Sequence, residues 1–191
     1  MNELQNSIIE KINLNNGFIT LDKFIKICMY DRDYGYYLKN SPIGKKGDFI
    51  TSPEISQLFG QMIGLYIFDY WKKNIKNSFN LIELGPGKGT LIKDVLNISY
   101  KFPEYFSSIN LKLIEINKKL IEYQKNILKI KNNKLNKIIW SNKLENIPNN
   151  KTVIIANEFF DCFPIKQTYR YNKNYFERVI KFNSDENKFI F

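Results

Sequence analysis

The chain has 191 residues, 43% hydrophobic and 25% charged, a composition that supports a folded core and excludes disordered, collagen-like and disulfide-scaffold proteins. Histidine is absent, which excludes an imidazole base and the zinc sites that contain His. The net charge of +10 comes with 26 Lys, 25 Asn and 29 Ile, the bias of an AT-rich genome, so we discount it as a sign of nucleic acid.

Residues 1–75 have a helical pattern and are expected to form an N-terminal helical and lid segment. Apolar spacings predict helices over 7–12 and 21–29, the second with Thr20 as N-cap. The clearest helix is predicted to begin with Ser52 as N-cap and to run to about residue 73. Gly60 and Gly64, four residues apart, indicate that one flank of this helix can approach another backbone closely.

Residues 76–165 alternate strands with helices, which predicts a parallel sheet with helices on both faces. The strands are expected at 79–84, 111–116, 137–140 and 152–156, and the helices at 90–99 and 118–130. Residues 166–191 instead predict an antiparallel meander, with strands at 166–171, 175–182 and 188–191 separated by Asn-rich turns.

A glycine loop follows the first of these strands, in Leu84-Gly85-Pro86-Gly87-Lys88-Gly89-Thr90. Alternate glycines let a ligand approach bare backbone at a helix N-terminus. The loop is neither a dinucleotide fingerprint, since Thr90 stands where the third glycine belongs, nor a P-loop, since Gly89 follows Lys88. Two interpretations remain: a loop for S-adenosylmethionine (SAM), and an ordinary turn between a strand and a helix.

Acidic and polar residues end the next strands. Glu115 closes the second predicted strand, where a carboxylate can accept hydrogen bonds from the hydroxyls of a ribose, although a solvated or capping Glu would look the same. Ser141 follows the third strand and could contact an adenine or simply form a turn. After the fourth strand come Asn157, Glu158 and Asp161, which fit either a ligand site at the sheet edge or a capped helix start.

The sequence also bounds location and partners. No apolar run approaches the ~18 residues of a membrane span. The N-terminus resembles neither a signal nor a transit peptide, so a cytoplasmic, bacterial location is expected, and a mitochondrial one only if a presequence is missing. Cys28 and Cys162 are expected to be reduced thiols, and no metal is expected.

Four stretches together resemble the MidA family of class I SAM-dependent methyltransferases, which includes a mitochondrial protein-arginine methyltransferase needed for assembly of respiratory complex I. The matching stretches are Gly35-Tyr36-Tyr37, Pro42 to Gly60, Ile82 to Leu91, and Ala156 to Ile165. The resemblance covers nearly the whole chain but only about the N-terminal half of a usual family member. It departs from the family pattern at Arg32, Gln61 and Ser141-Asn142, and above all in strand number: the family sheet has seven strands, and this chain has four and a meander.

The resemblance implies an α/β, Rossmann-like sheet truncated after its fourth strand, and methyl transfer from SAM to an arginine of a protein substrate, a complex I subunit or its bacterial counterpart. It implies that Glu83, Gly85, Gly87 and Gly89 hold the methionine end of SAM, Glu115 the ribose and Ser141 the adenine side. Glu158 and Asp161 would hold the guanidinium, with Asp48, Thr51 and Asn157 on the lid and substrate side.

Two alternatives stay open. One is an inactive methyltransferase-like module that binds a partner during assembly, and the other, suggested only by the charge, is an RNA methyltransferase. Nucleic acid and membrane insertion are not expected, whereas self-association through an open sheet edge is possible for a sheet of four strands.

Overall fold

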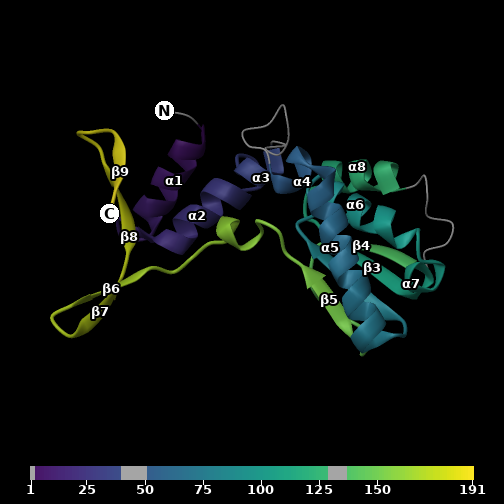
Figure 1. Cartoon of the computed structure of the whole chain (residues 1–191). Coiled ribbons are helices and arrows are strands. Elements are labelled where there is room, and N and C mark those ends of the chain that lie inside the picture. The colour runs from purple at the N-terminus through teal and green to yellow at the C-terminus, as the bar shows by residue number, and fades with distance from the viewer. Residues whose placement is uncertain (1–2, 40–50, 129–136) are drawn as a thin grey trace. The chain divides into compact units, whose positions relative to one another are not determined.

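The computed structural model describes residues 3–39, 51–128 and 137–191 (Figure 1). By contacts the chain forms two compact units. Residues 42–159 form one, which we call the sheet unit, and residues 1–41 together with 160–191 form the other, the terminal unit. The division into segments 1–75, 76–165 and 166–191 stays a sequence-based prediction.

The sheet unit is built on four parallel strands. Their order is β4-β3-β2-β5, with β2 over Phe79–Leu84, β3 over Ile109–Ile114, β4 over Lys137–Ser141 and β5 over Thr152–Ile155. β2 pairs with β3 along its whole length and with β5 from Asn80 to Glu83. The predicted parallel α/β sheet is therefore confirmed, with β3 two residues earlier than its apolar run suggested.

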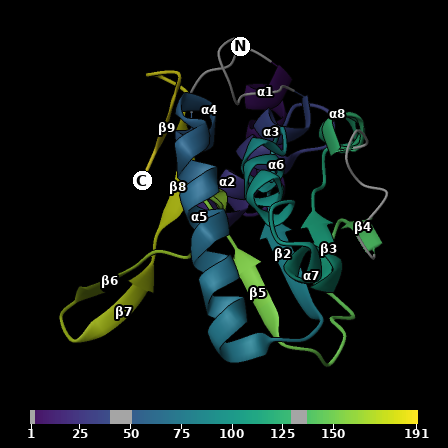
Figure 2. The same cartoon turned by 45° about the vertical axis from the view of Figure 1, so that its right-hand side comes forward.

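One face of the sheet carries the main core (Figure 2). Apolar side chains of β2, β3 and β5 pack there against helices α5 (Gln57–Tyr70), α6 (Thr90–Ser99), α7 (Pro103–Ser108) and α8 (Lys118–Leu128). On the other face Ile82, Leu84 and Ile114 cluster with Ala156 and Phe159. Within the sheet unit, the helices therefore pack on one face, because both β–α–β crossovers run from β2 through β3 to β4 in the same direction. The expectation of helices on both faces is not met by the sheet unit itself.

The long helix expected from residue 52 to 73 is divided into three pieces. α4 spans Ser52–Ile55, α5 begins at Gln57, and a π-helical turn, η1, covers Trp71–Ile75. Ser56 is extended, and its side chain accepts a hydrogen bond from the N–H of Leu58 at 3.2 Å. Ser56 is therefore the N-cap of the long helix, because its side chain offers the backbone a capping bond that competes with continuing the helix. The residue that precedes α4 is Thr51, not Ser52 as predicted.

α5 and α6 pack closely through glycine, as predicted. A Cβ on Gly60 would lie 2.6 Å from Cβ of Asp94, and one on Gly64 would lie 3.0 Å from the carbonyl oxygen of Val95. Any side chain at these two positions would separate the helices that cover the sheet.

The terminal unit is built from both ends of the chain. Its first part contains α1 (Glu3–Leu14), β1 (Ile19–Thr20), α2 (Leu21–Tyr30) and α3 (Tyr36–Lys39). Its second part contains the 3-10 turn η3 (Phe160–Cys162), β6 (Thr168–Tyr171), β7 (Asn174–Glu177), β8 (Val179–Asn183) and β9 (Lys188–Ile190). The two parts share a core of Ile8, Ile12, Ile19 and Ile180.

The C-terminal meander is divided into two hairpins. β6 pairs only with β7, whereas β8 pairs with β9 and, across the sequence, with β1. The single strand expected over 175–182 is wrong because the backbone of Arg178 interrupts it: its N–H donates to the carbonyl of Gln167 at 2.8 Å, and its carbonyl accepts from Leu21 at 3.2 Å. Among the residues that the structure describes, no helix is long and apolar enough to cross a membrane.

Candidate cofactor site

The sheet unit has a topological switch point between β2 and β5. The chain proceeds from β2 to β3 and β4 on one side, and then places β5 on the opposite side of β2. In open α/β sheets, ligands bind outside the carboxyl ends of the strands at such a point. The glycine loop leaves β2 there, and residues 156–159 leave β5 there, so the fold brings these two predicted segments to one edge.

The glycine loop has a backbone that only glycine adopts readily. Gly85, Gly87 and Gly89 have φ of +61°, +55° and +76°. A Cβ on Gly85 would lie 2.6 Å from the ring of Phe159, and Gly89 directly precedes α6 in the N-cap position. The loop therefore presents bare backbone beside a helix N-terminus, the arrangement that favours an anionic group.

Gln124 of α8 fixes this loop, a role that sequence reasoning missed because no local pattern indicates it. Its side chain is fully buried, and its Nε2 donates to the carbonyl of Gly87 at 2.7 Å. Its Oε1 accepts from Nε1 of Trp140 on β4 at 3.0 Å. Gln124 thus ties the glycine loop to the third strand of the sheet.

Glu115 lies just beyond β3, buried to 7% exposure. Its Oε1 accepts hydrogen bonds from the N–H groups of Ile116 and Asn117, at 2.8 and 2.9 Å. Burial raises the pKa of this carboxyl, and hydrogen bonds from backbone N–H groups, including that of Gly87, and from the Gln124 side chain oppose the rise. The side chain is held in one orientation beside the glycine loop.

Glu83, the second-last residue of β2, is 3% exposed. Burial, with the nearby Glu115 charge as a second cause, raises its pKa to about 8, and a hydrogen bond from the backbone of Ile92 opposes this. Its Oε2 has no hydrogen-bond partner within the described structure. A buried carboxyl oxygen without a hydrogen-bond partner is costly, so this atom is suited to a donor from a ligand, and a cationic donor would favour the ionised form of Glu83.

Glu54 is a further residue that sequence reasoning missed, because its position in the first turn of α4 explained it as a capping residue. Its Oε1 accepts from the hydroxyl of Thr90, and its Oε2 lies 3.5 Å from Nζ of Lys88. The carboxylate thereby joins α4 to the end of the glycine loop and the first residue of α6.

The predicted acceptor residues follow β5. Asn157 is half-buried, and Glu158 is exposed with φ of +47°. A non-glycine residue in the left-handed region costs on the order of 1–3 kcal/mol, and such residues cluster at functional sites. Asp161 belongs to the terminal unit, in η3, so the structure does not fix its position relative to Glu158.

The remaining predicted residues have local roles. Ser141 ends β4, its carbonyl accepts from the N–H of Glu115 at 2.9 Å, and its hydroxyl closes a turn with the backbone of Lys143. Thr51 precedes α4, and its carbonyl accepts from Glu54 and Ile55. Asp48 lies outside the described residues.

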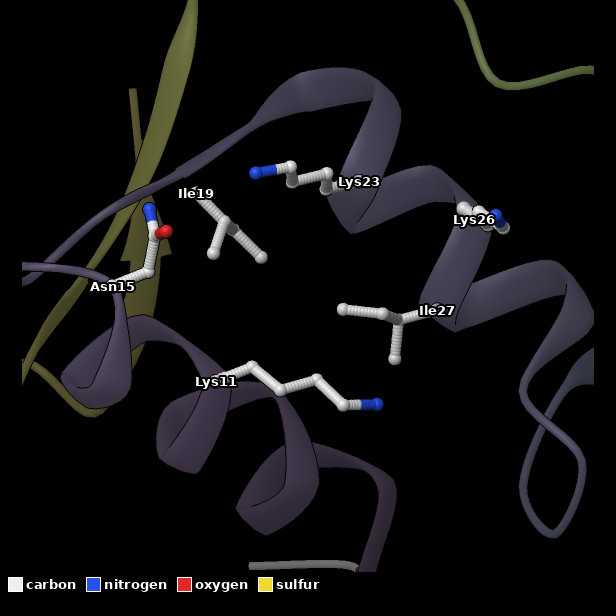
Figure 3. Close-up of a pocket in the computed structure, with 6 residues that line it drawn as sticks. All are labelled: Lys11, Asn15, Ile19, Lys23, Lys26 and Ile27. Carbon is white, nitrogen blue, oxygen red and sulfur yellow. The ribbon is translucent and has the colours of Figure 1, made fainter.

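A hollow of about 260 Å³ lies in the terminal unit between α1 and α2 (Figure 3). It is lined by Lys11, Asn15, Ile19, Lys23, Lys26 and Ile27, none of them a predicted site residue. Asp31 pairs with Lys11 at 3.2 Å, but the ammonium groups of Lys23 and Lys26 would repel a sulfonium or a guanidinium, so this hollow does not suit the predicted chemistry. In the described ranges, no three His, Cys, Asp or Glu side chains gather as a metal site.

Comparisons with known proteins identify the family of the chain. A family described as "Putative S-adenosyl-L-methionine-dependent methyltransferase" matches residues 62–191, more than half of the chain. The chain belongs to this methyltransferase family. The resemblance stated from the sequence is thereby confirmed.

Named relatives and a solved structure extend the comparison. The chain is 35% identical to a mitochondrial protein arginine methyltransferase NDUFAF7 homolog of Caenorhabditis elegans, over 96% of this chain and 47% of that protein. It is 33% identical to NDUFAF7 of Xenopus laevis, over 94% of this chain and 45% of the relative. A Burkholderia thailandensis protein crystallised with S-adenosyl-homocysteine has the same fold, with a TM-score of 0.80 at 21% identity, covering 98% of this chain and 48% of that one. The chain spans about half the length of these proteins.

Proposed function

We propose that the chain binds SAM at the glycine loop and takes part in methyl transfer to an arginine side chain of a protein. The observation that carries the proposal is the buried, unpartnered Oε2 of Glu83 beside three left-handed glycines at the switch point of the sheet. The methyltransferase family match and the names of the relatives support it.

The residues present suit each part of this cofactor. Glu83 would accept from the ammonium of the methionine end, which supplies the donor that its Oε2 lacks. The N–H groups of the loop and of the first turn of α6 would hold the methionine carboxylate. Glu115, held by Ile116 and Asn117, would accept from the ribose hydroxyls, and Ser141 would border the adenine.

When bound, SAM supplies an electrophilic methyl group on a sulfonium. The guanidinium that receives it is protonated and delocalised, with pKa above ~12, and is a poor nucleophile. Glu158 would accept hydrogen bonds from one edge of the guanidinium and orient a nitrogen toward the methyl group. We assign guanidinium binding to Asp161 as well, on the sequence-based ground that it follows the same strand. The left-handed backbone of Glu158 supports a functional role for this residue.

We further propose, on the resemblance to the MidA family, that the acceptor arginine belongs to a respiratory complex I subunit or its bacterial counterpart. The lid and substrate side would include Thr51, Asn157 and Asp48. The cytoplasmic location stays a prediction. The names of the mitochondrial relatives support a protein as the methyl acceptor. They do not decide where this chain is located.

Calorimetry with SAM tests the cofactor part. Replacing Glu115 by alanine should weaken SAM binding by about 1.5–3 kcal/mol, since a charge-assisted contact is lost. Glu122→Ala, on the exposed side of α8, is the matched control and should leave the affinity unchanged. Equal affinities for the two variants would remove the ribose role of Glu115.

Glu158→Gln tests the acceptor part. The variant keeps the shape of the side chain but loses the charge, so methyl transfer to protein should be lost while SAM affinity is nearly unchanged. Transfer is measured with labelled SAM and mass spectrometry of the arginine product, with Glu145→Gln as the control. Loss of SAM binding would make Glu158 a cofactor or structural residue, and SAM binding without any transfer by the native chain would favour the methyltransferase-like assembly module.

A further inference from the structure

An aromatic cluster in the terminal unit contains tyrosines of α2 and α3 and contacts the η3 turn. The proposed function gives these tyrosines no role. Tyr30 ends α2, and Tyr36 and Tyr37 begin α3, in the Gly35-Tyr36-Tyr37 stretch. The rings of Tyr30 and Tyr37 are stacked, with centroids 5.9 Å apart and planes at 23°. Tyr36 meets Tyr37 edge to face at 5.3 Å.

This cluster is tied to the η3 turn, which carries Asp161. The hydroxyl of Tyr30 donates to the carbonyl oxygen of Cys162 at 3.1 Å and lies 3.2 Å from its Sγ. The link spans 132 residues of sequence, so it positions α2 against the turn that follows β5. Asp161, next to Cys162, is exposed.

Asp161 directly precedes Cys162, whose carbonyl oxygen and Sγ contact the Tyr30 hydroxyl. Burial raises the pKa of the Tyr30 hydroxyl most, followed by its contacts with Cys162 and the charges of Tyr37 and Asp161. Burial also raises the pKa of the Tyr37 hydroxyl, followed by the charges of Cys162 and Asp161. Both hydroxyls therefore stay protonated at physiological pH.

Aromatic faces beside a carboxylate have the chemistry that recognises a guanidinium. A guanidinium stacks on an aromatic face and donates two parallel hydrogen bonds to a carboxylate, which a lysine ammonium cannot reproduce. We propose that Asp161, Tyr30 and Tyr37 form a recognition site for the guanidinium of the arginine that is methylated. This inference rests on the proposed function and adds Tyr30 and Tyr37, which select arginine, to the Asp161 carboxylate assigned above.

The site is tested by ligand-observed saturation-transfer NMR on the whole chain, a measurement that also works on self-associated protein. The probe is Nα-acetyl-L-arginine amide, and the comparison ligands are the lysine analogue and the neutral citrulline analogue, which has nearly the shape of arginine. The arginine probe should bind at least about tenfold more tightly than either analogue, because only arginine combines the planar fork with a charge.

Variants locate the binding. Asp161→Asn should weaken arginine binding about tenfold. Tyr37→Leu should weaken it severalfold, whereas Tyr37→Phe, which keeps the ring, should restore most of it. The controls are Asp185→Asn in an exposed turn and Tyr175→Leu on the exposed β7, which should leave binding unchanged. Because Asp161 is exposed, its replacement by asparagine tests the site even if Tyr37→Leu fails to fold.

Two results would overturn the inference: citrulline binding as well as arginine, or Asp161→Asn and Tyr37→Leu behaving like their controls. Methyl transfer measured on the same variants separates this inference from the proposed function. Arginine-selective binding without any transfer would contradict the proposed function alone. Transfer whose KM for the protein substrate is the same in the native chain and in Tyr37→Leu would contradict the role of the tyrosines alone.

Discussion

Glu83 is the residue whose ionisation is most strongly altered by folding among those with a role in the candidate site. It lies in a core strand, buried next to Glu115, and its pKa is raised to about 8. A carboxyl with a raised pKa binds its proton more tightly in the folded protein than in the unfolded chain. Its contribution to stability is therefore fully present below its unfolded pKa, near 4.5, and is lost as pH rises through about 8.

Glu83→Gln should remove this pH dependence. We expect the native chain to lose stability steadily from pH 5 to pH 8.5, whereas the variant, which cannot ionise, should change less and be the more stable protein at pH 8.5. Urea unfolding at several pH values measures the difference, with Glu104→Gln on the exposed surface of α7 as the control. Parallel pH profiles for the native chain and Glu83→Gln would show that Glu83 is not the group responsible.

At the scale of single elements, the sequence predicted the features that are set by residues close together along the chain. The apolar runs gave the strands of the sheet, and α6 begins and ends where expected, at Thr90 and Ser99. The three glycines indicated the loop because positive φ is a local demand. The break at Ser56 was missed because Ser52 and Pro53 supplied an equally good helix start four residues earlier.

Contacts across the fold could not be predicted in this way. Gln124 meets Gly87 across 37 residues, and Glu54 meets Thr90 across 36. A buried glutamine in a helix has the same local pattern as an exposed one, and an acidic residue in a first turn is explained by the helix dipole alone. Only the packing of α8 and α4 beside the loop gives these side chains their roles.

Gln124→Leu tests the connection between α8 and the glycine loop. Leucine fills much of the volume but leaves the Gly87 carbonyl and the Trp140 indole N–H without their partner, at about 1–3 kcal/mol for each buried group. We expect lower thermal stability and weaker SAM binding together. Tyr123→Leu, on the half-exposed side of the same helix, is the control. If the variant has the same unfolding midpoint temperature as the native chain and the same affinity for SAM, the loop does not depend on Gln124.

For the whole molecule, the main feature is apolar surface on the sheet unit. β5 pairs only with β2 in the described structure, and its Ile154 is 47% exposed. α5 leaves Leu58, Met62 and Tyr66 more than half exposed, although its other side is packed on α6. An uncharged apolar edge strand is a site for pairing with another chain.

We expect the isolated chain of 191 residues to self-associate through β5. Sedimentation velocity should show mass increasing with protein concentration, and Ile154→Lys should shift the distribution toward the 22.7 kDa monomer, because charge on an edge strand opposes pairing. Leu144→Lys adds the same charge at a similarly exposed loop residue and is the control. A monodisperse native monomer at all concentrations would contradict this role of the edge.

The pairing of β1 with β8 also sets the order in which the protein can fold on the ribosome. α1, β1 and α2 are synthesised well before Ile180, which completes their core. At ~5–20 residues per second, roughly ten to thirty seconds separate the two. The whole sheet unit is synthesised in that interval and can fold as an inserted module while Ile8, Ile12 and Ile19 still lack their cover. The apolar side chains of α1 and β1 are therefore exposed during translation until Ile180 has been made, which favours binding of a chaperone in that interval.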